Sequence, residues 1–240
     1  MAGLGTIVNV AAIIVGGLCA LWFGRLLRES VQDALGKVCG VCVLVIGMGG
    51  ALAQMLRPQG GALVSGGGLL LIAALALGTL LGELIGIEAD FERLGAWLKA
   101  KTGSGDDRRF IEGFVTASLT VCIGAMAIVG AIQDGLLGDH SVLFTKAILD
   151  FIIILVMTCH LGKGCIFSAL PVAVLQGGVT LLAGLLRPVM TAQALSNLSL
   201  VGSVLIFCVG INLVWGKKLR VANMLPAVVL AVAFAFLPVF

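Results

Sequence analysis

Long apolar stretches recur along this chain, and they constrain its fold more than any other feature of the sequence. A helix needs roughly 20 apolar residues to cross the hydrocarbon core of a bilayer. Such stretches lie at 5–24, 34–56, 64–86, 110–133, 141–159, 165–186, 196–215 and 220–239. Because 60% of the residues are hydrophobic and only 11% are charged, a soluble core could not enclose this much apolar surface. The sequence therefore predicts an all-α polytopic membrane protein of about eight transmembrane helices, a single domain over residues 1–240 embedded in the lipid bilayer.

The basic residues gather in or beside every second loop between these stretches. The loops after the first, third, fifth and seventh stretch account for Arg25, Arg28, Lys37, Arg93, Lys99, Lys101, Arg108, Arg109, Lys163, Lys217, Lys218 and Arg220. Only Arg57 and Arg187 belong to the other loops. By the positive-inside rule, the odd-numbered loops are cytoplasmic and both termini lie outside. The same parity predicts that HLGKG at 160–164 is a turn between two helices, since one merged helix would move Lys217 to the outer side.

The longest polar segment contains an amphipathic pattern over about 88–101. Within IEADFERLGAWLKAK, the side chains of Phe91, Leu94, Trp97 and Leu98 share one helical face and the charges share the other. This pattern predicts a short helix lying on the cytoplasmic membrane surface. It connects two spans in the simpler interpretation, and serves as a docking site or gate lever in the functional one.

Glycine-rich segments recur in pairs of predicted helices. Similar patterns occur at 16–28, 77–86 and 177–187 and, in the helices that follow, around Gly36 and Gly47, Gly113 and Gly124, and Ser199 and Gly210. They indicate three hairpins, of which the third would be inverted relative to the first, as in transporters built from inverted repeats. Glycine runs at 47–50 and 177–178 are the predicted places for a helix to break. The spacing of Gly78, Gly82 and Gly86 favours close helix packing and a homo-oligomer.

Lys146 and Asp150 are the charged pair that falls inside a predicted membrane span. They are four residues apart, so their side chains share one helical face. An ionisable group at the bilayer centre costs roughly 2.5–3.5 kcal/mol on insertion scales, so it normally faces a partner or a cavity. A neutralised structural pair is one interpretation of these residues. A site for a solute or a proton is the other.

Six further polar residues complete the predicted site. Gln133 and Asp134 end the fourth span at its outer side, where they would line the mouth of a pathway. The carboxamides inside apolar runs are Asn9, Gln176, Asn212 and Asn223, which either join helices or line a polar cavity. No cofactor or metal site is predicted, and the sequence contains no HExxH, GxSxG or paired catalytic aspartates, so we expect no enzyme activity. The net charge of +3 is too small to indicate a nucleic-acid partner.

Several segments resemble a known family. They are GLGTIVNVAAIIVGG near the start, FVTASLTVCIGAMAIVGAIQDGLLGD, TKAILD, VGINL and NMLPA. Together they resemble the YdfK and YqgA family of bacterial inner-membrane proteins, a domain of unknown function. The resemblance implies a multi-pass protein of the bacterial cytoplasmic membrane, for which transport has been suggested without an established substrate.

Two functional hypotheses follow from these residues. The first is a transporter or channel for a small solute or ion, with Lys146 and Asp150 at its centre. The second is a membrane scaffold or sensor that acts through helix contacts or a partner protein. The effect of Asp150→Asn discriminates between them, because only the first hypothesis requires the carboxylate.

Overall fold

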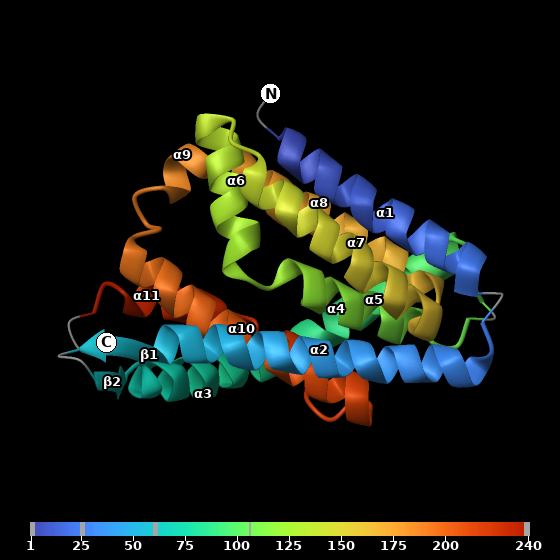
Figure 1. The fold of residues 1–240 in the computed structure, drawn as a ribbon, viewed down its shortest axis with the longest axis horizontal. Helices are drawn as coiled ribbons and strands as arrows, with labels where there is room; N and C mark the ends of the chain where they lie inside the picture. Colours follow the sequence, from blue (N-terminus) through green and yellow to red (C-terminus); the bar gives the residue numbers. More distant parts are fainter. Residues whose placement is uncertain (1–2, 25–26, 60–61, 106, 238–240) are drawn as a thin grey trace.

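A computed structural model describes residues 3–24, 27–59, 62–105 and 107–237, and 83% of the structure is helical (Figure 1). The α-helices are α1 (Leu4–Gly24), α2 (Glu29–Met55), α3 (Gly68–Ile85), α4 (Ile87–Lys101), α5 (Phe110–Cys122), α6 (Ala125–Leu137), α7 (Ser141–Leu161), α8 (Ala169–Leu181), α9 (Ala183–Leu186), α10 (Ala192–Trp215) and α11 (Pro226–Phe234). Two 3-10 helices, η1 (Lys163–Ser168) and η2 (Val221–Met224), precede α8 and α11. Strands β1 (Leu56–Gln59) and β2 (Ala62–Ser65) form an antiparallel hairpin between α2 and α3.

Length and composition confirm a polytopic helical membrane protein. Within the described residues, six helical segments are long and apolar enough to cross a bilayer: α1, α2, α3, α7, η1 with α8, and α10. The pair α5 and α6 meets the same criterion as one segment bent by 61°, which makes seven. The eighth predicted span, 220–239, is a shorter apolar segment over Val221–Phe234.

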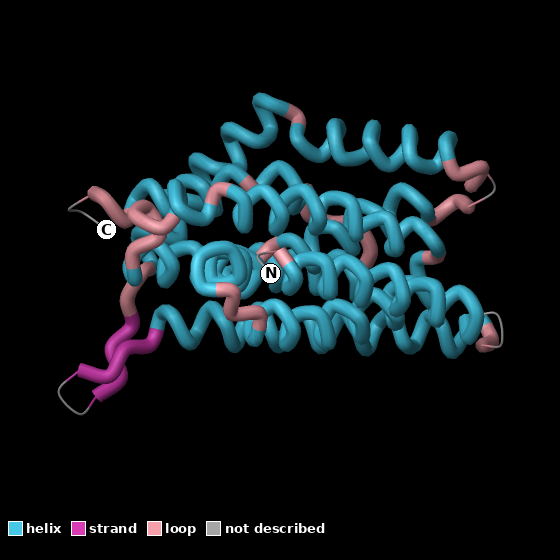
Figure 2. The backbone as a smooth tube through the Cα atoms, turned by 90° about the horizontal axis from the view of Figure 1, so that it is seen from above, coloured by secondary structure: helices cyan, strands magenta, loops and turns pink. Residues whose placement is uncertain are grey.

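The helices form two groups with the bent pair between them (Figure 1). In the first group α1 packs along α7 and contacts α8, and in the second α2 packs along α10 while α3 packs on α11. Helices α5 and α6 both contact α7 and α8, while α5 also packs on η1 and α6 on α9. Figure 2 shows the β1–β2 hairpin extending beyond the ends of the helices.

Glycines set the close approach of α2 and α10. A Cβ on Gly47 would lie 2.5 Å from the backbone nitrogen of Phe207, and one on Gly210 would lie 2.7 Å from the backbone nitrogen of Leu44. The two contacts are reciprocal. Gly47 touches the residue three positions before Gly210, and Gly210 touches the residue three positions before Gly47. Such contacts bring two backbones together where any larger residue would hold them apart.

Two further glycines of α2 extend the same interface. Gly40 lies against Leu213, and Gly50 lies against Ser203. Contacts therefore run backwards along α10 as they run forwards along α2, so the two helices are antiparallel. Helices α3 and α11 are antiparallel as well, with Gly78 against Ala227 and Gly82 against Asn223.

The structure corrects several predicted boundaries. The glycine runs at 47–50 and 177–178 are predicted breaks, but α2 and α8 continue through them. The predicted helix 110–133 is instead interrupted after Cys122. Residues 64–65, assigned to the third span, belong to β2. A helix, α4, covers the segment with the amphipathic pattern, and the predicted turn at HLGKG is present, with the positive-φ residue Gly162 between α7 and η1.

Of the basic residues used for the topology, Arg25 lies outside the described residues, and so does the side chain of Arg57.

Gly47→Ala should destabilise the protein, whereas Gly49→Ala should not. The new methyl group at Gly47 meets backbone atoms of α10, while nothing lies within 4 Å of Gly49 on the same helix. Overpacking of this kind costs about 1–3 kcal/mol, and helical Gly→Ala in open space gains up to roughly 1 kcal/mol. Thermal unfolding of both variants in detergent measures the difference. Equal melting temperatures would contradict the proposed contact.

Candidate functional site

Lys146 and Asp150 lie one turn apart on α7 and are both buried. Their exposed fractions are 7% and 3%, whereas Ile148 between them is 64% exposed. The ammonium of Lys146 contacts the Asp150 carboxylate and donates a second hydrogen bond to the carbonyl of Val121, with Nζ and O 2.8 Å apart. A buried ion pair is tolerated only when further hydrogen bonds compensate its desolvation, and Val121 supplies one.

Asn9 and Gln176 join this pair from two other helices. Asn9 Nδ2 on α1 donates to Asp150 Oδ2 at 3.0 Å and to Gln176 Oε1 on α8 at 3.2 Å. Asn9 is fully buried and Gln176 is 1% exposed. Asn9 Oδ1 and Gln176 Nε2 have no hydrogen-bond partner among the described residues. These four side chains and the Val121 carbonyl form what we call the central cluster.

Small residues on α1 allow Asn9 to reach Asp150. A Cβ on Gly16 would lie 2.7 Å from the carbonyl oxygen of Phe151, and one on Gly5 would lie 2.8 Å from the side chain of Leu143. The two glycines flank Asn9 along α1, so the helix contacts α7 closely both before and after the carboxamide. Helix α1 therefore carries both predicted features: glycines that allow close packing and a polar residue of the site.

The break between α5 and α6 explains why Val121 is available. In a continuous helix its carbonyl would accept a hydrogen bond from the backbone N–H of Ala125. The chain instead leaves the helical conformation at Ile123, which is extended, and at Gly124, whose φ of 140° and ψ of 149° favour glycine. The freed carbonyl at the end of α5 accepts from Lys146. A cation at a helix C-terminus is also favoured by the helix dipole.

Two threonines missed by the sequence analysis continue the polar line. Thr6 on α1 and Thr180 on α8 are 7% and 9% exposed, and their hydroxyl oxygens lie 3.4 Å apart. Thr6 precedes Asn9 by three residues and Thr180 follows Gln176 by four, so the hydroxyls sit about one helical turn from the central cluster. Their spacing in sequence could have identified them, because residues three or four positions from Asn9 and Gln176 share a helical face with those carboxamides.

Asp134 and His140 extend the line toward the end of the molecule where α1 begins. Asp134 on α6 is fully buried, and its Oδ1 lies 2.6 Å from Nδ1 of His140. A Cβ on Gly5, next to Thr6, would lie 3.3 Å from Asp134 Oδ2, which has no hydrogen-bond partner among the described residues. The Oε1 atom of the half-buried Gln133 is similarly unpartnered.

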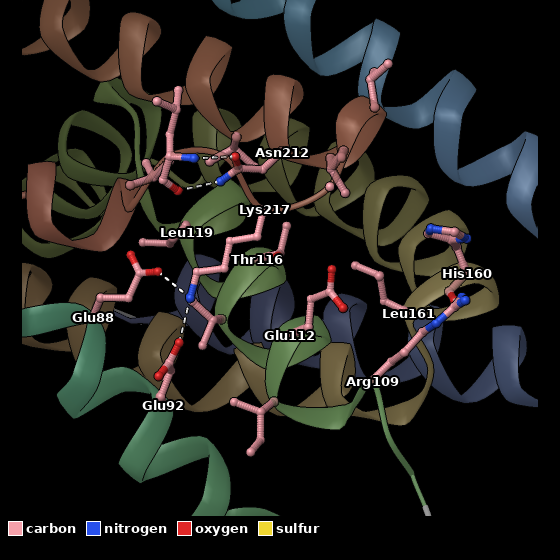
Figure 3. Close-up of a pocket in the computed structure, with 18 of the residues that line it drawn as sticks. Glu88, Glu92, Arg109, Glu112, Thr116, Leu119, His160, Leu161, Asn212 and Lys217 are labelled. Carbon is pink, nitrogen blue, oxygen red and sulfur yellow. Dashed lines mark hydrogen bonds and ion pairs between the residues drawn. The ribbon is translucent and has the colours of Figure 1, made fainter.

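A charged pocket of about 610 Å³ opens at the opposite end (Figure 3). Its lining includes Glu112, Thr116 and Leu119, which follow one face of α5 inward. Leu119 is two residues before Val121, so the pocket wall and the central cluster share the last turn of α5. Glu112, at the start of α5, is exposed and points into this pocket.

The structure places Asn212 and Asn223 apart from the central cluster. Asn212 Oδ1 accepts from the backbone nitrogens of Lys218 and Leu219 at 2.9 Å each, and its Nδ2 donates to the Leu219 carbonyl at 2.7 Å. It thereby holds the turn after α10, at the edge of the charged pocket. Asn223 Oδ1 accepts from the backbone nitrogen of Glu88 at 2.7 Å and satisfies a free N–H of the first turn of α4.

Lys217 ties α4 to the same end of the protein. Its ammonium lies 2.6 Å from carboxylate oxygens of both Glu88 and Glu92 (Figure 3). Burial lowers the pKa of Lys217, but the hydrogen bonds to Glu88 and Glu92 outweigh it and hold the pKa above the ordinary value of 10.5. The contribution of this contact to stability is therefore complete below pH 10.5 and is lost as the pH rises through the raised pKa.

These features define a class: a multi-pass helical membrane protein with a polar interior. The spanning helices expose large apolar side chains, as lipid contact requires, and bury charges that a bilayer would reject. Trp22, Trp97 and Trp215 are each more than half exposed and lie on α1, α4 and α10. All three belong to the end that carries the charged pocket, as in the aromatic belts of membrane proteins.

The chain belongs to the family described as "Protein of unknown function (DUF554)", whose model matches residues 4–236. It is 29% identical over 226 residues to "Uncharacterized membrane protein YdfK" of Bacillus subtilis (strain 168), covering 94% of this chain and 93% of that protein. It is 27% identical over 234 residues to "Uncharacterized protein YqgA" of Escherichia coli (strain K12), covering 95% and 94%. No solved structure matches the chain significantly. The resemblance inferred from the sequence segments is confirmed.

Gly124→Ala should weaken the fold through backbone strain alone. The nearest atom to a Cβ at this position is Ile206 Cδ1 at 4.0 Å, so no clash contributes. Forcing a side chain into this conformation costs about 1–3 kcal/mol. Gly177→Ala is the matched control, because it is helical with nothing within 4 Å. Unfolding in detergent should separate the two variants, and an unchanged Gly124→Ala melting temperature would argue against the break.

Lys217→Met should loosen α4, and Lys218→Met should not. Lys217 contacts two carboxylates, while the neighbouring Lys218 side chain forms no ion pair among the described residues. Trypsin cleavage after Lys99 and Lys101, at the end of α4, reports the difference as a faster cleavage rate. Identical rates for the two variants would show that this contact does not hold the helix.

Proposed function

We propose that this protein is a membrane transporter or channel for a small solute or ion that passes through the central cluster. The observation that carries the proposal is the buried Lys146 and Asp150 pair bound to the carbonyl that the α5–α6 break sets free. Discontinuous helices whose freed backbone groups meet the substrate near the middle of the bilayer are the usual construction of transporter sites. A structural ion pair alone would not require a broken helix.

The polar residues support a route from one end of the molecule to the other. It begins in the charged pocket along α5, continues at the central cluster and the Thr6–Thr180 hydroxyls, and ends at Asp134 and His140. Its first part is an open pocket, whereas Thr6, Thr180 and Asp134 are all at least nine-tenths buried. This asymmetry fits a carrier open toward the pocket end and closed at the other.

We further propose an inverted repeat of α1, α2 and α3 with α8, α10 and α11. Each helix of the first set packs against its counterpart in the second. The reciprocal glycine contacts between antiparallel α2 and α10 are those expected around a two-fold axis lying in the membrane plane. Motion of one set against the other would open the route alternately to the two sides.

The orientation follows from charge. Lys37, Arg108, Arg109 and Lys217 all line the charged pocket, so three of the basic loop regions meet at one end. We propose that this end faces the cytoplasm of a bacterium and that the termini lie on the outer side. The exposed apolar faces would serve contacts within a homo-oligomer, since Gly78 and Gly82 already pack against residues of the same chain.

Asp150→Asn should strongly reduce transport by purified protein in liposomes. Hydrogen bonds to a charged group contribute about 1.5–3 kcal/mol, so losing the charge should lower flux roughly 10- to 100-fold. Asp90→Asn, an exposed aspartate on α4, is the control and should leave flux unchanged. The assay uses a panel of ions, amino acids and sugars.

Two results would reject the transport proposal: no flux for any solute in the panel, or flux that Asp150→Asn leaves intact. A stable protein partner recovered together with those results would instead favour the scaffold or sensor hypothesis.

A further inference from the structure

Lys146 occupies a position whose surroundings are those of a cation-binding site. Its ammonium lies against a carboxylate oxygen of Asp150 and 2.8 Å from a main-chain carbonyl oxygen, that of Val121. The fully buried Asn9 binds the same Asp150 oxygen through Nδ2, while its own carbonyl oxygen is unpartnered among the described residues. Carboxylate, backbone and carboxamide oxygens are the hard ligands that alkali cations take in membrane carriers.

We propose that Asp150, the Val121 carbonyl and Asn9 form a binding site for a monovalent alkali cation, and that the ammonium of Lys146 fills this site in the structure. The inference rests on the proposed transport function, whose ligand class it names. Lys146 would then be a tethered competitor that a free cation must displace.

Charge favours a monovalent over a divalent ligand. Asp150 is the sole carboxylate among the proposed oxygen ligands, so one positive charge balances it, whether that charge is the Lys146 ammonium or a free cation. A divalent ion would leave a net positive charge in surroundings of low dielectric constant, at a cost that the remaining neutral ligands could not offset. The end of α5 adds a partial negative charge of about half an electron, which again suits a single cation.

The chemistry of lysine makes displacement feasible. Its charge is carried on a flexible four-carbon stem, so the ammonium can leave without movement of α7. Asp150 has a short side chain that Asn9 holds from the opposite helix. The oxygen ligands therefore stay in place when the ammonium swings aside, and these ligands hold one positive charge both before and after the exchange.

The test measures cation binding in detergent, so it does not depend on transport. Wild type, Lys146→Met and the double variant Lys146→Met with Asp150→Asn are purified in N-methyl-D-glucamine chloride. Each is titrated with LiCl, NaCl, KCl or MgCl₂ at constant ionic strength while thermal unfolding is followed. Lys146→Met should show a saturable rise in melting temperature with at least one alkali cation, about 5 °C at 100 times Kd. Wild type should respond only at much higher cation concentrations, because Lys146 competes for the site, and the double variant should show no rise.

Four outcomes would overturn the inference. Lys146→Met could respond no more than the double variant, or wild type could respond as strongly as Lys146→Met, which would put the cation elsewhere. Mg²⁺ could stabilise Lys146→Met as well as the alkali cations do. Lys146→Met could also fail to fold in every salt while the double variant folds, which would show that an unpaired Asp150 finds no cation. Absent flux in liposomes together with the predicted shift would reject transport and leave the cation site standing.

Discussion

A backbone carbonyl without a partner inside an apolar protein must find a donor, and the organisation of this protein depends on how that requirement is met at Val121. The α5–α6 break removes the carbonyl's helical partner, and Lys146 replaces it. The lysine charge then requires Asp150, and Asp150 accepts in turn from Asn9. Each polar group satisfies the one before it in this series. The interruption after α5 thus leads to hydrogen bonds that connect α5, α7 and α1.

The part of the site that lies within one helix could be predicted from the sequence. Lys146 and Asp150 are four residues apart, and helical geometry alone brings them together. Asn9 and Gln176 are recognisable as polar groups needing partners, but they are 167 residues apart and their meeting depends on helix packing. Asn212 and Asn223 have the same local character and instead satisfy backbone groups at a turn and a helix start. A carboxamide in an apolar run does not reveal which partner it will find.

Most of the spans could be located from hydrophobicity, but the position of the helix break could not. Three glycines within 47–50 suggest flexibility, yet two of them, Gly47 and Gly50, face α10 and serve close packing. The break occurs at the isolated Gly124, where no neighbouring helix backbone is close enough to require glycine. A glycine that serves packing and one that serves conformation look alike in sequence, because tertiary contacts decide between the two.

The reciprocal packing of α2 and α10 has an energetic consequence for the proposed motion. If one repeat tilts against the other, every interaction that breaks on one side of the two-fold axis has an equivalent that can form on the other side. The opposite tilt is then built from nearly the same interactions, with the two helices exchanging roles. The two arrangements would differ little in free energy, so a single bound ion or proton would suffice to choose between them.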